Sequence, residues 1–214
     1  MESSAKHERP GRNPDQTRSR ILESAFAEMY RKGFQGMRLD DVLAATGLTK
    51  GALYHHFPNK QALGYAVVDE VIRPTVEAMW VQPLRQARDP LLGLVSVIER
   101  LPDAKPAELI RYGCPLNNLA QEMSPLDEGF RRRLDAVFGL WHGVTHEALQ
   151  RARDQGRIRP DVDCEAAAMF VMAALEGCIG LAKNAQSIDR LKQCNRGLIQ
   201  YLLSLANGMD QKQA

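Results

Sequence analysis

The residues best suited to chemistry are gathered in segment 49–56, whose sequence is TKGALYHH. The Lys50 ammonium and the Tyr54 hydroxyl are groups that hold phosphate oxygens, and side chains at the start of a helix can reach base edges in DNA. Gly51 weakens a helix by about 1 kcal/mol relative to alanine, a cost that is explained if the backbone must come close to a ligand. The segment therefore predicts contact with nucleic acid, and a solvated pair of amphipathic helices is the alternative interpretation.

A second candidate for chemistry is Cys114, which stands between Gly113 and Pro115. Proline is favoured at the first position of a helix, which places Cys114 at the N-cap. A thiol there faces the positive end of the helix dipole, which lowers its pKa and raises its thiolate fraction. Cys114 is thus a candidate reactive thiol, and a buried structural thiol is the alternative.

His142 and His146 are four residues apart, a spacing that puts two imidazoles on one helical face and can chelate a metal ion. No carboxylate completes a recognised zinc motif in the sequence, and HExxH is absent. We therefore expect no metal and no cofactor. The sequence also lacks a nucleophile elbow, a phosphate loop and a dinucleotide fingerprint, so an enzyme is a remote alternative.

Two short helices are predicted to hold the segment around Lys50. The first has inward-facing residues at helical spacing, namely Leu39, Val42, Leu43 and Thr46. Gly47 can adopt a left-handed C-cap, and the Thr49 hydroxyl can cap the second helix, which turns Leu53 and Phe57 inward with Ala52. Arg38 precedes the first helix, so its cap comes from Asp40 or is absent, and Arg38 is free to reach a phosphate. This arrangement is a helix-turn-helix.

The remaining elements are also expected to be helical. A helix over about 15–31, ended by Gly33, covers the helix-turn-helix, and Asn59 caps a following helix whose first turn holds Lys60, where a phosphate is favoured. Pro74 is expected to kink that helix. Further helices are predicted at 90–101, 106–112, 115–123, 126–155, 164–184 and 187–206, and no strand is expected.

The last two predicted helices are suited to a subunit interface. Residues 166–175, AAAMFVMAAL, are apolar on every side and need cover all round, while the final helix carries leucines along one seam. Burial inside a monomer's own core is the alternative. The expected interface residues are Phe170, Ala173, Ala174, Gly177, Leu181, Leu191, Leu198 and Leu202.

The composition is that of an ordinary globular protein, with 214 residues, 44% hydrophobic and 25% charged. Residues 1–60 hold ten Lys/Arg minus seven Asp/Glu, or +3, whereas the remainder has eighteen minus nineteen, or −1. No signal peptide is recognised, and the apolar run 166–182 is shorter than the ~20 residues of a membrane span. We expect a cytoplasmic protein without a membrane partner, whose four cysteines are reduced thiols.

Residues 39–63 resemble the DNA-reading core of the TetR family of one-component transcriptional regulators. The family pattern is a DIA-like helix, AGVSKGTLYYHF and then K-x-x-L, and this chain reads DVL, ATGLTKGALYHHF and KQAL. The resemblance implies an all-α fold with a flexible basic arm at 1–14, a three-helix DNA-binding domain at 15–60 and a helical ligand-binding and dimerisation domain at 61–214. The family commonly has Ser or Thr before the DIA-like helix, where the present chain has Met37 and Arg38. Together with the residue chemistry given above, the resemblance gives as expected DNA contacts Arg38, Thr49, Lys50, Gly51, Ala52, Tyr54, His55 and Lys60.

The resemblance also implies a bacterial-type homodimeric repressor, released from a pseudo-palindromic operator by a small-molecule inducer. Candidate effector contacts, each of which could instead be core, are Leu116, Asn117, Met123, Phe138, Trp141, His142, Thr145 and Phe170. Residues 113–122 are similar to a subgroup that includes electrophile-sensing repressors. Covalent electrophile or redox modification of Cys114 is therefore the alternative to reversible inducer binding.

Overall fold

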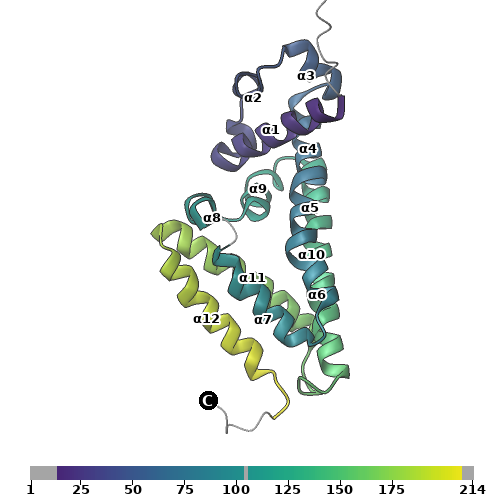
Figure 1. Ribbon diagram of the computed structural model, residues 1–214, viewed down its shortest axis with the longest axis vertical. Coiled ribbons are helices and arrows are strands. Elements are labelled where there is room, and N and C mark those ends of the chain that lie inside the picture. Colours follow the sequence, from purple (N-terminus) through teal and green to yellow (C-terminus); the bar gives the residue numbers. More distant parts are fainter. Residues whose placement is uncertain (1–13, 104–105, 209–214) are drawn as a thin grey trace, which may run out of the picture. The chain divides into compact units, whose positions relative to one another are not determined.

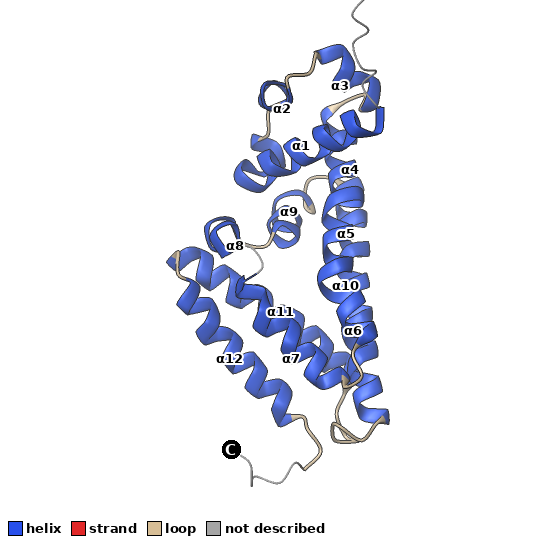
Figure 2. Ribbon diagram, in the orientation of Figure 1, coloured by secondary structure: helices blue, strands red, loops and turns tan. Residues whose placement is uncertain are grey.

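The computed structural model describes residues 14–103 and 106–208, and within these ranges the chain is helical apart from turns, loops and one isolated bridge, between Ile158 and Ala206 (Figure 2). The all-helical fold is as predicted. Contacts divide the chain into two compact units between Val67 and Val68. The basic arm expected at 1–14 lies outside the described residues except for Pro14, and the functional boundary expected at residue 60 stays a prediction.

The first unit contains α1 (Pro14–Gly36), α2 (Leu39–Thr46), α3 (Lys50–His56) and α4 (Lys60–Val67) (Figure 1). At Gly33, φ is 75° and ψ is 169°, so helical geometry is broken where the sequence predicts the end of the first helix. A short further turn completes α1. Both α2 and α4 pack on α1.

Buried aliphatic side chains hold this unit together. Ile21 of α1, Val42 of α2, Leu53 of α3 and Leu63 of α4 are each 0% exposed. Polar contacts add to this core, because a guanidinium nitrogen of Arg20 donates to the carbonyl oxygen of Thr46 at 2.6 Å. The apolar periodicity of the sequence therefore becomes one shared core that fixes α3.

The second unit begins with a helical run of changing pitch. Its parts are η1 (Val68–Ile72), α5 (Arg73–Val76), η2 (Glu77–Val81) and α6 (Gln82–Gln86), and η1 and η2 are π-helical. Pro74 and Pro83 stand in the first turns of α5 and α6. Proline lacks an N–H and crowds the turn before it, and a wider π turn relieves both problems. The run continues past Pro74 as a helix with a change in pitch, and a kink at Pro74 stays a prediction.

The other helices of this unit follow the predicted joints closely. They are α7 (Pro90–Arg100), the 3₁₀ turn η3 (Leu101–Asp103), α8 (Pro106–Tyr112), α9 (Pro115–Met123), α10 (Glu128–Asp154), α11 (Cys164–Ala185) and α12 (Ile188–Ser204). Asp89, Asp127, Asp163 and Ser187 cap α7, α10, α11 and α12 through their side-chain oxygens. These caps define where each helix begins.

The core of the second unit lies around α10 and α11. Helix α10 packs against α7, α9 and α11, and α11 lies beside α12 (Figure 1). Helix α11 is, among the described helices, the one that is long and apolar enough to span a membrane by length and composition. Its Ala168, Val171 and Leu175 are nevertheless 0% exposed inside the unit. Core helices commonly have this composition.

A disulfide joins α11 to α12, between Cys178 and Cys194, whose Cα atoms are 5.5 Å apart. The expectation that all four cysteines are reduced is therefore wrong for this pair, because the fold places two distant cysteines at bonding distance. Cys114 and Cys164 are free thiols.

Candidate functional site

The outer face of α3 carries the residues that the sequence assigns to DNA contact. Lys50, Gly51 and His55 are exposed, as is Thr49 just before the helix, and the Tyr54 side chain is 49% exposed. On the opposite face Leu53 is 0% exposed. Ala52 is half-buried between the two faces. The structure thus brings these predicted residues together on one accessible helix surface.

The local sequence explains how α3 is presented. Gly47 takes the left-handed conformation, with φ of 64°, and its N–H donates to the carbonyl oxygen of Leu43 at 2.8 Å, which ends α2. The Thr49 hydroxyl then accepts from the N–H of Ala52 at 3.2 Å, which begins α3. Both caps are as predicted, and together they make the sharp turn between the two helices.

Gly51 has no packing role within the described part of the chain. A Cβ atom added there would have no heavy atom within 4 Å, apart from its immediate helical surroundings, and its φ is not in the left-handed region. A glycine inside a helix lowers stability by about 1 kcal/mol relative to alanine. The free protein therefore gives no reason for glycine, which points to a close approach by something outside the chain.

The cations near α3 differ in how freely they can reach a ligand. Lys50 Nζ lies 3.2 Å from Asp40 Oδ1, but both side chains are mostly exposed, so the pair is weak and easily exchanged. Arg38 is exposed and makes no side-chain cap on α2. Lys60 Nζ instead donates to the carbonyl oxygen of Gln35 at 3.0 Å and lies 4.9 Å from the centre of the Phe34 ring. The structure therefore engages Lys60 within the unit, and the phosphate contact expected of Lys60 stays a prediction.

In the second unit, half of the expected effector contacts are core residues. Leu116, Met123, Trp141 and Thr145 are at most 5% exposed. The Thr145 hydroxyl donates to the carbonyl oxygen of Trp141 at 2.9 Å, so its hydrogen is already used within α10. Asn117, Phe138 and His142 are half-buried, whereas Phe170 is exposed. The eight residues therefore range from fully buried to exposed.

Trp141 keeps one feature of a binding group. Its ring lies against Trp80 with the ring centres 4.8 Å apart, yet its indole Nε1–H has no hydrogen-bond partner within the described residues. Buried polar groups are nearly always paired, so this indole N–H is a donor that a bound molecule could use.

His142 and His146 share one face of α10, as predicted, with nearly parallel rings. Both face Glu165 of α11, at 3.5 Å from His142 Nε2 and 3.6 Å from His146 Nδ1. Among the described residues no group of three or more His, Cys, Asp or Glu is arranged to hold a metal ion. Glu165 was not singled out in the sequence, because its partners are distant along the chain.

Cys114 stands at the N-cap of α9, but its environment is not the expected one. Burial of the thiol and the nearby carboxylate of Glu176 raise the pKa of Cys114 well above its ordinary value, outweighing the backbone N–H groups of Asn117 and Leu116. The expectation of a lowered pKa is therefore wrong. Burial also raises the pKa of Glu176, whose contacts with Cys114 and Asn117 only partly offset that rise. Glu176 lies on α11, and no local pattern in the sequence places it beside Cys114.

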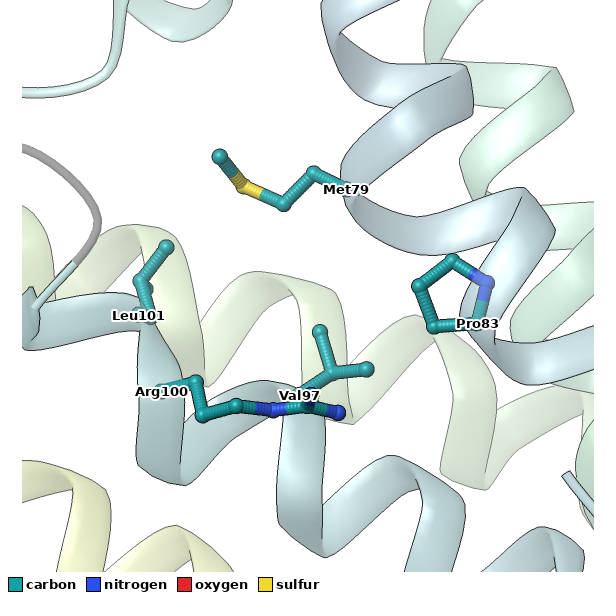
Figure 3. A pocket seen from close by; sticks show the side chains of 5 residues that line it. All are labelled: Met79, Pro83, Val97, Arg100 and Leu101. Carbon is teal, nitrogen blue, oxygen red and sulfur yellow. The ribbon is translucent and has the colours of Figure 1, made fainter.

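A small hollow opens between η2, α6 and α7 (Figure 3). It has a volume of about 160 Å³ and is lined by Met79, Pro83, Val97, Arg100 and Leu101. A wider, more polar hollow of about 540 Å³ lies alongside and shares Pro83 and Arg100. None of the expected effector contacts lines either hollow. No sequence motif marks these residues, because their apolar spacing is that of ordinary core helices.

Helices α11 and α12 present an apolar surface. Met169, Phe170 and Leu181 of α11 are 55%, 51% and 61% exposed, and the Phe170 ring meets Tyr201 of α12 with the ring centres 4.6 Å apart. Ala173 and Gly177 are also exposed on α11, and Ala174 is half-buried. We call this surface, comprising Met169, Phe170, Ala173, Gly177, Leu181 and Tyr201, the α11–α12 face.

The leucine seam of the last helix faces the opposite way. Leu191 and Leu202 are 0% exposed and Leu198 is 4% exposed, because they pack inside their own unit. Assigning these three residues to a subunit interface is therefore wrong, and the alternative of burial in the chain's own core holds for them. Asn195 on the same seam donates through Nδ2 to the carbonyl oxygen of Ile98 at 3.1 Å, which ties α12 to α7.

Two protein families match this chain. Residues 21–67 match "Bacterial regulatory proteins, tetR family", and residues 91–198, half of the chain, match "Tetracyclin repressor-like, C-terminal domain". An uncharacterized HTH-type transcriptional regulator from the lacX 3′ region of Lactococcus lactis subsp. lactis is 31% identical over 82% of this chain and 88% of its own length.

Two further relatives agree with this result. The HTH-type transcriptional repressor DhaR of Mycobacterium sp. (strain GP1) is 25% identical, over 81% of this chain and 87% of its own length. The crystal structure of a TetR transcriptional regulator from Chloroflexus aurantiacus J-10-FL is 27% identical, with a TM-score of 0.80, over 92% of this chain and 98% of that one. With the exposed face of α3 and these matches, the chain belongs to the TetR family of helix-turn-helix transcriptional regulators, which bind operator DNA and are not enzymes.

Proposed function

We propose that this regulator is a cytoplasmic homodimeric repressor that is released from a pseudo-palindromic operator by a small-molecule inducer. The observation that carries the proposal is the outer face of α3, where Lys50, Gly51 and Tyr54 are exposed together. Lys50 can exchange Asp40 for a phosphate, and the Tyr54 hydroxyl can donate to another. At Gly51 the missing Cβ lets the DNA backbone or a base edge approach the helix.

Two copies of α3 are needed to read a pseudo-palindrome. The α11–α12 face supports dimerisation because it is apolar and exposed, and because Ala173 and Gly177 allow a second backbone to come close. A twofold axis through this face would give two identical reading helices and hence two half-sites of the same sequence. We propose Phe170, Ala173, Ala174, Gly177 and Leu181 as its α11 contacts.

The inducer is proposed to bind within the second unit, where Asn117, Phe138 and His142 are each half-buried and the indole N–H of Trp141 has no hydrogen-bond partner among the described residues. These side chains suit a largely apolar molecule with at least one hydrogen-bond acceptor. Repression requires only that the DNA-bound and released states differ in inducer affinity. A difference of about 1–3 kcal/mol weakens operator binding roughly 5- to 150-fold.

Binding to DNA from upstream of the protein's own gene tests the proposal, by fluorescence anisotropy at two salt concentrations with unrelated DNA as competitor. Lys50→Ala should weaken binding by about tenfold and lower the salt dependence by about one counterion. Tyr54→Phe removes one hydroxyl and should weaken it less. The matched control is Arg88→Ala, an exposed cation of the second unit. Equal losses of DNA affinity in Lys50→Ala and Arg88→Ala would contradict a DNA-reading role for α3. A selection from genomic fragments in which the protein binds no fragment more tightly than the competitor DNA would contradict it as well.

Covalent switching through Cys114 is the weaker candidate, because its raised pKa leaves little thiolate to react. Cys114→Ser distinguishes the two modes of release. The variant should keep its response to a reversible inducer, found by screening compounds against the fluorescence of Trp80 and Trp141, the chain's two tryptophans. If thiol-reactive compounds release the operator from the wild type and not from Cys114→Ser, the protein is switched by covalent modification of Cys114.

A further inference from the structure

The disulfide between Cys178 and Cys194 is not used by the proposed mechanism of repression. Cys178 is 4% exposed on the inner side of α11, whereas Cys194 on α12 is partly exposed. Their Cα atoms are 5.5 Å apart, within the range in which two cysteines can form a disulfide without backbone movement. Cys194 is therefore the more accessible residue of the pair, and Cys178 is held beside it.

The bond joins the same two helices that carry the α11–α12 face. Phe170 and Tyr201, whose rings meet with centres 4.6 Å apart, stand eight residues before Cys178 and seven residues after Cys194. Gly177 is the direct neighbour of Cys178 and is exposed on the face itself. The disulfide and the ring contact thus connect the same two helices at separate places along the face.

A disulfide is unusual in the compartment where this protein is proposed to work, and this step rests on the proposed function. A protein that binds chromosomal DNA works in the cytoplasm, where glutathione and thioredoxin keep thiols reduced. Disulfides found there are usually transient or redox-sensing, and lasting structural bonds are rare. The other two cysteines, Cys114 and Cys164, are unpaired, and burial raises the pKa of each thiol, so the redox chemistry centres on Cys178 and Cys194.

We propose that Cys178 and Cys194 form a reversible redox site that couples the oxidation state of the cell to the assembly of the α11–α12 face. The oxidant is a hydroperoxide. The Cys194 thiolate attacks its terminal oxygen, the O–O bond breaks, and an alcohol, or water from hydrogen peroxide, leaves after taking a proton. The Cys178 thiolate then attacks the resulting sulfenic sulfur, the S–O bond breaks, and water leaves. Two thiols have lost two electrons and two protons to one peroxide.

Reduction needs a dithiol, such as a protein of the thioredoxin type. Its first thiolate attacks one sulfur of the pair and releases the other as a thiol, and its second thiolate closes the dithiol's own disulfide. Both cysteines return as thiols. Oxidised protein holds α11 and α12 in one arrangement, which keeps the α11–α12 face preformed, whereas reduced protein must order it on assembly. The dissociation constant of the reduced dimer should therefore be higher than that of the oxidised dimer. The ratio is about fivefold or more for a coupling free energy of the usual size between disulfide formation and dimerisation.

The experiment uses the full-length chain in buffers of graded reduced and oxidised glutathione. After unfolding and alkylation with N-ethylmaleimide, intact mass counts the free thiols among the four cysteines. We expect two labels in oxidising buffer and four in reducing buffer, with the linked peptide joining Cys178 to Cys194. Sedimentation should give a dimer dissociation constant about fivefold or more higher in reducing buffer. Cys194→Ala should remove this difference, whereas Cys164→Ala, which leaves the pair intact, should retain it.

Two results would overturn the inference: four labels in every buffer, or equal dissociation constants for the two redox states of the wild type. Both use the unsubstituted chain, so a variant that folds poorly cannot mask them. Operator binding is measured on the same samples. If the dimer responds to redox state but no DNA is bound above competitor, the proposed repressor function fails and the redox site stands.

Discussion

Helix α3 of the first unit and helix α10 of the second use their residues in opposite ways. In α3 the chemical groups of Lys50 and Tyr54 point outward while Leu53, fully buried, points inward, so recognition and folding belong to different side chains. In α10 the candidate contact Trp141 is 3% exposed and packs on Trp80, so one side chain would serve both purposes.

The difference follows from the size of each ligand. DNA is larger than the domain that reads it and must be met by a protruding surface, whereas a small molecule is enclosed by residues that otherwise fill the interior. A substitution in the first unit should therefore change either DNA binding or folding stability. A substitution at a contact residue of the second unit should change ligand binding and folding stability together.

The largest effect should come from Trp141→Ala. Removing a buried tryptophan that packs against Trp80 leaves a cavity and should lower the free energy of unfolding by about 3–5 kcal/mol. Urea unfolding followed by circular dichroism measures this. His142→Ala, one residue along and half-buried, is the comparison and should cost much less. Similar small losses for both variants would mean that Trp141 is not a core residue, and the contrast between the helices would fail.

In the first unit the two faces of α3 can be separated by neighbouring substitutions. Leu53→Ala should cost about 2–5 kcal/mol of folding stability, because its side chain is fully buried. Tyr54→Ala should change stability by no more than about 0.5 kcal/mol, as expected at the surface, yet abolish tight operator binding. Thermal unfolding and anisotropy on the same samples check both statements. A large loss of stability in Tyr54→Ala would show that the outer face also supports the fold.

Much of the first unit could be predicted because its signals are local. The Gly47 turn, the Thr49 cap and the break at Gly33 depend on residues within a few positions of one another, and all are found as predicted. The contact of Lys60 with the carbonyl oxygen of Gln35 could not be predicted, because the two residues lie far apart along the sequence, and its contact with DNA stays a prediction.

The second unit was predictable in its helix boundaries but not in what its side chains meet. Periodicity placed the leucines of α12 on one seam, yet could not tell whether that seam faces a partner or the chain's own core, and the structure buries Leu198 and Leu202. The environment of Cys114 likewise depends on Glu176, which a separate helix supplies. Contacts between helices far apart in sequence leave no local pattern.

The burial of Glu176 in the second unit can be tested without knowing the inducer. Burial raises its pKa above the ordinary 4.5. Below about pH 4.5 the folded and unfolded states both hold the proton, so its contribution to stability is fully present. Above pH 4.5 the carboxyl ionises in the unfolded state before it ionises in the folded state. Its contribution to stability is therefore lost as the pH rises through the raised pKa. Stability should therefore fall from pH 4.5 toward neutrality on account of this group.

Glu176→Gln removes the titration and should unfold at a higher temperature than the wild type at pH 7.5, by about 2–4 °C for each kcal/mol recovered. At pH 4.5 the two proteins should differ little. Glu147→Gln, an exposed residue loosely paired with Arg85, is the control and should show no such divergence. Curves for Glu176→Gln and wild type that stay parallel across this range would mean that burial does not raise the pKa of this carboxyl in the folded protein.

The smallest change in stability, and the sharpest test of the contrast, is Gly51→Ala. Open space surrounds the position, so alanine should fit and raise the free energy of unfolding by about 1 kcal/mol. Gly139→Ala on α10 is equally unobstructed and should stabilise to a similar extent. Operator affinity, measured by anisotropy, should fall for Gly51→Ala alone. Only at Gly51 would DNA occupy the space that the alanine methyl group fills. Unchanged affinity in Gly51→Ala would mean that DNA contacts α3 through its longer side chains without approaching its backbone.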